Sequence, residues 1–90
     1  MLEQEVQVTD ALGLHARASA RLVRLASRFT SNVTLSRDDT GVQADAKCIL
    51  SILHVAAPYG TSLRLIIDGK DEGEAMREIV ELFERGLAEN

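Results

Sequence analysis

Alternation of apolar and polar residues predicts a strand near the start of the chain. Between Glu3 and Thr9, Val6 and Val8 fall on one face and polar residues on the other. Asp10–Gly13 forms a connector. Helical spacing follows, with arginines opposite an apolar side made of Ala20, Leu22, Val23, Ala26 and Phe29. We therefore expect an amphipathic helix over Ala16–Arg28.

A period of two returns in the next segment and predicts a hairpin. Apolar and polar residues alternate over Asn32–Arg37, and the alternation resumes at Val42 and Ala44. The residues between them, Asp38–Gly41, have the composition of a turn. This segment should therefore contribute two antiparallel strands.

The apolar run over Ala46–Val55 fits either a buried strand or a short helix, and we favour the helix. Pro58 and Gly60 should end this element. Alternation over Ser62–Asp68 then predicts a last strand.

A closing helix is expected after a turn at Asp68-Gly69. Asp71 with Glu74 three residues later resembles a capping box. The apolar stripe of this helix consists of Ala75, Met76, Ile79, Val80 and Phe83. The order β-α-β-β-α-β-α predicts an α+β fold, an open-faced β-sandwich in which three helices cover one face of a four-stranded antiparallel sheet. We expect one domain over residues 1–90.

Composition narrows the class of protein. Only 3% of the 90 residues are aromatic although 46% are hydrophobic, so the core must be aliphatic. No stretch approaches the roughly 18 apolar residues of a membrane helix, and acidic Glu3 and Glu5 follow Met1, so we expect no membrane insertion and a cytoplasmic protein. Cys48 is the only cysteine, which excludes an internal disulfide and a multi-cysteine metal site; we expect neither a metal nor a cofactor.

Charge is distributed unevenly along the chain. The net charge of −4 argues against nucleic acid as a partner. Acidic residues are absent from Ala11 to Arg37 and gather toward the C-terminus. The acid-free segment holds half of the ten basic residues, namely Arg17, Arg21, Arg24, Arg28 and Arg37. The first third of the chain should therefore offer a basic surface to an acidic protein or a phosphate.

The segment Gly13–Arg17 carries the candidate chemistry, because it places His15 where a connector becomes a helix. The first N–H groups of a helix lack internal partners and attract anions. Arg17 adds a permanent positive charge. A histidine that only caps the helix is the alternative, but the neighbouring glycine, the arginine and the acid-free helix favour a phosphoryl site.

Four separated motifs make the sequence similar to the HPr family, the histidine-containing phosphocarriers of the sugar phosphotransferase system. They are Gly13–Arg17, Ala26–Phe29, Ala46–Leu50 and Asp68–Glu72. The resemblance runs nearly end to end, with a slightly long hairpin. It implies a phosphocarrier rather than an enzyme.

The resemblance also implies how the carrier works. His15 would accept a phosphoryl group on Nδ1 from phosphorylated Enzyme I and pass it to a sugar-specific acceptor of the Enzyme IIA type. Ala16, Arg17 and Ala18 would bind the phosphate. The residues implied in partner docking are Arg21, Arg24, Lys47, Ile49, Leu50 and Leu53, although burial in the core is an equal alternative for Leu53. We expect a monomer.

Three positions depart from the family pattern. Ala18 replaces a proline and leaves an extra backbone N–H near His15, at the expense of a looser junction. Cys48 stands where the family often carries a regulatory serine, so we infer that the serine switch is absent or replaced. Ala56 replaces the glycine that usually ends the middle helix, and His54 is interpreted as structural.

Other functions remain open at this point. A nitrogen-branch or regulatory carrier would use His15 in the same way without feeding sugar transport. An enzyme would pair Cys48 as nucleophile with His15 or His54 as base, in a chain with little room for a pocket. An inert interaction domain is disfavoured by the intact Gly-x-His-x-Arg pattern.

Overall fold

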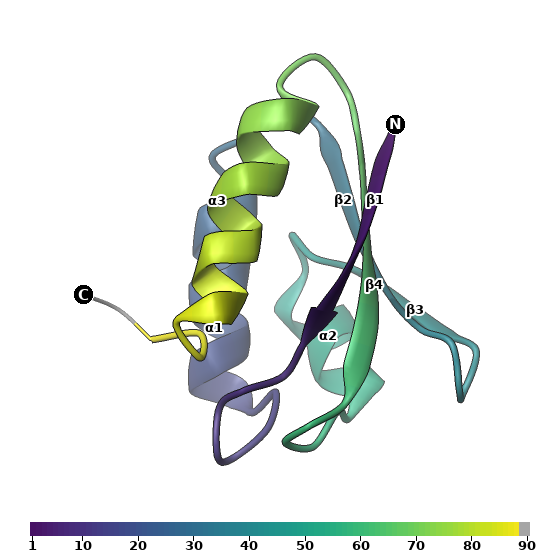
Figure 1. The fold of residues 1–90 in the computed structure, drawn as a ribbon, viewed down its shortest axis with the longest axis vertical. Coiled ribbons are helices and arrows are strands. Elements are labelled where there is room, and N and C mark those ends of the chain that lie inside the picture. Colours follow the sequence, from purple (N-terminus) through teal and green to yellow (C-terminus); the bar gives the residue numbers. More distant parts are fainter. Residues whose placement is uncertain (89–90) are drawn as a thin grey trace.

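The computed structural model describes residues 1–88, and its elements follow the predicted order. Figure 1 labels the strands and helices in chain order. Their bounds are β1 Leu2–Gln7, α1 Ala16–Ala26, β2 Asn32–Arg37, β3 Val42–Asp45, α2 Ile49–Val55, β4 Ser62–Asp68 and α3 Glu72–Glu84.

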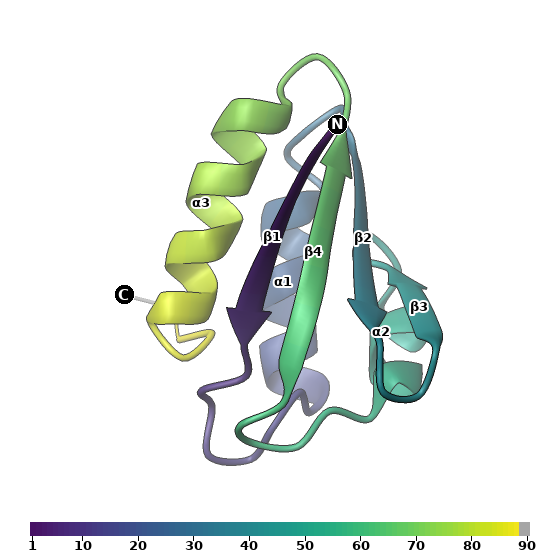
Figure 2. The ribbon, with the colours of Figure 1, turned by 45° about the vertical axis from the view of Figure 1, so that its right-hand side comes forward.

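The four strands form one antiparallel sheet in the order β1-β4-β2-β3. Leu65 of β4 pairs with Leu35 of β2, and Leu63 pairs with Val6 of β1. These side chains therefore share one face, as the alternation predicted. Figure 2 shows α1 and α2 behind the strands and α3 beside β1, with no helix in front of the sheet. The open-faced sandwich is thus confirmed.

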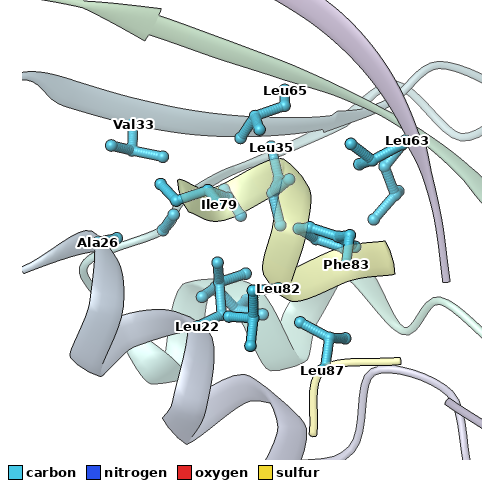
Figure 3. Close-up of a cluster of buried hydrophobic side chains, with 14 of the residues drawn as sticks. Leu22, Ala26, Val33, Leu35, Leu63, Leu65, Ile79, Leu82, Phe83 and Leu87 are labelled. Carbon is cyan, nitrogen blue, oxygen red and sulfur yellow. The ribbon is translucent and has the colours of Figure 1, made fainter. Parts of the chain in front are cut away.

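The core lies between this face and helices α1 and α3. Leu22 and Ala26 of α1 meet Ile79, Leu82 and Phe83 of α3 beneath the sheet (Figure 3). All five side chains are buried, and full burial of a leucine, isoleucine or phenylalanine side chain stabilises a fold by about 1.5–3 kcal/mol.

Helix α1 presents a slightly different face to the core than expected. Ala20 and Val23 are only partly buried, whereas Ala18 and Ser19 are fully buried. The Ser19 hydroxyl donates to the Leu14 carbonyl, 3.3 Å away, which satisfies its polar atom. The helix therefore turns Ala18 and Ser19 inward, whereas Ala16 and Arg17, directly after His15, stay exposed.

The ambiguous segment 46–55 is a helix, as favoured, but it begins at Ile49 rather than Ala46. The Cys48 N–H donates to the Asp45 carbonyl, so the residues before Ile49 form a turn. Ile52 and Val55 are buried. Helix α2 is consequently short, with one face on the core.

The capping box at the start of α3 was a wrong prediction. The Asp71 side chain makes no cap; its carboxylate accepts the N–H groups of Thr30 and Ser31 and the Ser31 hydroxyl. The carboxylate binds these donors from the loop between α1 and β2 and not the first N–H groups of α3. The Ser31 hydroxyl, with the two amides, lowers the pKa of Asp71 to about 2.

Helix α2 ends at Val55, and its C-cap is Ala56, whose φ of 52° is in the left-handed region. Arg37 Nη1 donates to the carbonyls of Val55 and Ala56, at 3.3 and 2.9 Å, and satisfies the helix end. Arg37 also pairs with Asp39. One arginine of the predicted basic surface is therefore used inside the fold.

None of the helices between residues 1 and 88 has the length and apolar character needed to cross a membrane.

Candidate functional site

His15 is the N-cap of α1. Its extended backbone (φ −81°, ψ 179°) precedes the first helical residue, and its carbonyl accepts the Ser19 N–H at 2.8 Å. The ring turns back onto the helix, where Nδ1 accepts the Arg17 N–H at 3.3 Å. Nδ1, one of the two ring nitrogens, therefore faces the positive end of the helix dipole.

The first turn of α1 offers donors beside His15. The N–H groups of Ala16 and Ala18 have no hydrogen-bond acceptor in residues 1–88, and the exposed Arg17 guanidinium forms no hydrogen bond or ion pair there. Ala18, however, has an exposed fraction of 0%. The amides that an anion could contact directly are thus those of Ala16 and Arg17.

Asp10 lies against the other side of the His15 ring, a contact that we did not predict. Its Oδ2 is 3.3 Å from His15 Nε2, and its Oδ1 accepts the Leu12 N–H at 2.8 Å. The Leu12 amide, followed by His15, lowers the pKa of the Asp10 carboxyl. The sequence did carry one signal for the position of this side chain: an aspartate in a turn favours a hydrogen bond to the backbone N–H two residues later, here that of Leu12.

Gly13 anchors the loop that carries His15. Its φ is +72°, and a Cβ there would lie 2.7 Å from the Ala57 carbonyl oxygen and 2.9 Å from Pro58 Cα. The next residue, Leu14, donates to the same Ala57 carbonyl at 2.8 Å. Figure 1 shows these loops side by side below the helices. The segment following α2 therefore holds the histidine loop.

The apolar residues of α2 differ in exposure. Ile49 is 37% exposed and Leu50 is 74% exposed, whereas Leu53 is partly buried. Leu12 and Tyr59, from the two loops beside His15, are also exposed, at 70% and 66%. We did not single out these last two residues from the sequence, because an isolated apolar residue in a loop carries no pattern.

The basic candidates have internal contacts. Lys47 Nζ donates to the Phe29 carbonyl at 2.7 Å, just beyond the C-terminal end of α1. Since α1 has 11 residues, this end is roughly 16 Å from the His15 end. Arg21 Nη1 donates to the Leu87 carbonyl at 3.0 Å. Arg21 and Arg24 each take part in further interactions.

Cys48 is exposed at the N-cap of α2, and its thiol does not cap the helix. It forms no hydrogen bond with His15 or His54 in the part of the chain described. The same residues 1–88 contain no group of three or more metal-ligating side chains. The nucleophile and base pair considered for an enzyme is therefore not assembled.

Known proteins resemble the chain over nearly its whole length. The family model described as PTS HPr component phosphorylation site matches residues 2–85. The phosphocarrier protein HPr of Xylella fastidiosa is 49% identical over 90 residues, covering 100% of this chain and 99% of that protein. HPr of Cupriavidus necator is 43% identical (99% and 98% covered), and the HPr-like protein Crh of Bacillus subtilis is 40% identical (88% and 91%).

Solved structures of this kind have the same fold. The crystal structure of HPr-C-His from Thermoanaerobacter tengcongensis superposes with a TM-score of 0.91 at 32% identity, covering 100% of this chain and 99% of that one. An HPr dimer from the same organism gives a TM-score of 0.76 at 32% identity, with 99% and 100% covered. The chain therefore belongs to the HPr family, the phosphocarrier proteins of the phosphotransferase system.

Proposed function

We propose that this protein accepts a phosphoryl group on His15 Nδ1 from phosphorylated Enzyme I and gives it to a sugar-specific acceptor of the Enzyme IIA type. The observation that carries the proposal is the Nδ1 atom directed at the Arg17 N–H, 3.3 Å away, at the start of α1. A helix N-terminus favours the negative charge of a phosphate. The nucleophile and the anion site thus coincide.

The transfer needs one bond to form and one to break. The Nδ1 lone pair attacks phosphorus, and the donor keeps the electron pair of the bond that it loses. The Arg17 N–H then donates to a phosphate oxygen instead of Nδ1, joined by the Ala16 N–H and the Arg17 guanidinium. Ala18 contributes through the helix dipole, since its amide is below the surface.

Partners would dock on the exposed apolar side chains of α2. Ile49 and Leu50 are the apolar anchors, and Leu53 extends them at the rim. Arg21 and Arg24 provide positive potential for an acidic partner. Lys47 supports this surface indirectly, because its bond to Phe29 joins the start of α2 to the end of α1. The carrier acts in this scheme as a cytoplasmic monomer.

The proposal is tested by incubating the protein with Enzyme I and labelled phosphoenolpyruvate. The wild type and His54→Ala should gain acid-labile label, and His15→Ala should gain none. His54, exposed on α2, is the matched control. The label should then move to an Enzyme IIA added afterwards. Acid-labile label on His15→Ala would overturn the proposal.

A regulatory or nitrogen-branch carrier is the second candidate, since two relatives are HPr-like proteins named Crh, and the solved structure of Crh from Bacillus subtilis is described as a catabolite repression HPr. Label that stays on the protein when sugar-specific acceptors are added would favour this candidate. In either case we propose that the serine switch is absent, because Cys48 occupies its position. Phosphorylation near residue 48 by the matching serine kinase and ATP, for instance on Ser51, would contradict this.

A further inference from the structure

We propose that Asp10 is a positioning residue for His15: its Oδ2 keeps the ring proton on Nε2 and so keeps the Nδ1 lone pair available for attack on phosphorus. The inference rests on the proposed role of His15 and adds to it a residue from the connector before α1. Asp10 does not touch the phosphoryl group; it acts through the ring.

The two partners of the ring have opposite polarity. The Arg17 backbone N–H can only donate, so Nδ1 must accept from it. The ionised Asp10 carboxylate can only accept, so Nε2, 3.3 Å away, must donate to it. The imidazole tautomer with its proton on Nε2 satisfies both contacts, and the other neutral tautomer satisfies neither. The contacts therefore select one tautomer from both ends of the ring.

Asp10 is itself held in place. Its second oxygen, Oδ1, accepts the Leu12 N–H at 2.8 Å, which fixes the side-chain direction within the loop. The Asp10 and His15 side chains are 18% and 23% exposed, so this contact is more shielded than an ordinary surface pair. Gly13 packs the same loop on Ala57. The carboxylate is thus directed at Nε2 by the local backbone.

This arrangement also balances charge during transfer. When the Nδ1 lone pair forms the bond to phosphorus, the ring gains positive charge while the proton stays on Nε2. The Asp10 carboxylate compensates that charge from the nitrogen opposite to phosphorus. When the phosphoryl group moves on, its bonding electrons return to Nδ1 and the ring leaves as neutral imidazole, with the proton still on Nε2. Neither step requires a proton to be moved.

The sharpest test is Asp10→Asn, which separates the role of Oδ1 in the turn from the role of Oδ2 at His15. The asparagine oxygen can still accept the Leu12 N–H, so the turn is kept, but its NH₂ group then presents a donor to Nε2. We expect two-bond ¹H–¹⁵N spectra of the unphosphorylated neutral ring to show wild-type protonation on Nε2 and reduced Nε2 protonation in the variant. The kcat for accepting phosphate from phosphorylated Enzyme I should fall about tenfold or more with KM nearly unchanged.

Asp68→Asn is the matched control, because Asp68 pairs with the Met1 amino group at the end of β4 opposite to the loop that packs on Gly13, and it should leave spectra and rates unchanged. Thermal unfolding and Leu12 amide exchange check that the Asp10→Asn loop remains folded. Spectra in which Asp10→Asn keeps the wild-type tautomer would overturn the inference, and so would an unchanged kcat. A wild type that takes no label would refute the carrier function instead, while the spectra would still decide whether Asp10 sets the tautomer.

Discussion

Ala56 and Leu87 are the two non-glycine residues of the described chain, 1–88, whose backbone has a positive φ, and Ala56 is the one that caps the end of α2. Its φ of 52° lies in the left-handed region, which costs a non-glycine residue about 1–2 kcal/mol. The two carbonyl bonds from Arg37 and the buried residues Val55 and Ala57 on either side hold this conformation.

We expect Ala56→Gly to raise the free energy of unfolding by about 1 kcal/mol, because glycine adopts this conformation without the steric cost. Urea unfolding measures the change. Ala57→Gly is the control at the next position: Ala57 is buried and has no positive φ, so that variant should be less stable than wild type. If Ala56→Gly were only as stable as the wild type, or less stable, the backbone of Ala56 would not be strained.

Whether a site residue could be predicted from the sequence depended on how local its contacts are. His15 and Arg17 were predicted because the helix start is visible in neighbouring residues. Asp10 was missed, although it is only five residues from His15, because a side-chain contact across a turn leaves no periodic signal. The contact of Lys47 with Phe29 joins two elements and could not be read from either.

Among the helices, α1 has a first turn whose stiffness should depend on the residue at position 18. Ala18 replaces the proline of the family pattern, and its N–H has no acceptor in residues 1–88. A proline would therefore remove no hydrogen bond while fixing φ near its helical value.

We expect slower hydrogen exchange of the Ser19 amide and its neighbours in Ala18→Pro than in the wild type, because the junction between loop and helix becomes stiffer. Native-state exchange followed by NMR measures this. Amides of α3 serve as the internal reference and should not change. Identical exchange in the first turn of α1 would refute the looser junction.

Element boundaries were predictable where a turn and an alternating pattern meet. β2 and β4 have the predicted bounds, Asn32–Arg37 and Ser62–Asp68, because each alternating run is closed by turn residues. α2 begins three residues later than predicted, since the residues before Ile49 bond back to the strand. Apolar content alone cannot distinguish a helical turn from the turn that precedes it.

For the whole molecule, Asp71 joins parts that are far apart in sequence. Its carboxylate accepts bonds from Thr30 and Ser31, forty and more residues earlier, and thereby connects the end of α1 to the start of α3. Gly69 lies close to Ser31 in the same corner, where a Cβ would be 2.6 Å from Ser31 Cα.

This corner should make stability depend on pH in the acid range. The pKa of Asp71 is lowered to about 2 in the fold, below the value of about 3.9 for an unfolded chain. The folded state therefore favours the ionised form. Its contribution is fully present above pH of about 4 and is lost as the pH falls toward about 2.

Urea unfolding between these pH values should show a steeper loss of stability in the wild type than in Asp71→Asn. Asp68→Asn, at an exposed carboxylate nearby, is the comparison and should retain the wild-type slope. Equal slopes for the wild type and Asp71→Asn would contradict a role for ionised Asp71.

Gly13 has a consequence for how descent within this family can be followed. The glycine is required because the backbones of two loops nearly touch there. This requirement comes from the fold and does not depend on phosphoryl transfer. A descendant that lost its phosphoryl group could replace His15 and Asp10 freely, yet would retain the glycine as long as it kept the fold. Among diverged homologues, a sequence that keeps the equivalent of Gly13 but lacks the equivalent of His15 would identify a protein that has the same fold and no longer carries a phosphoryl group.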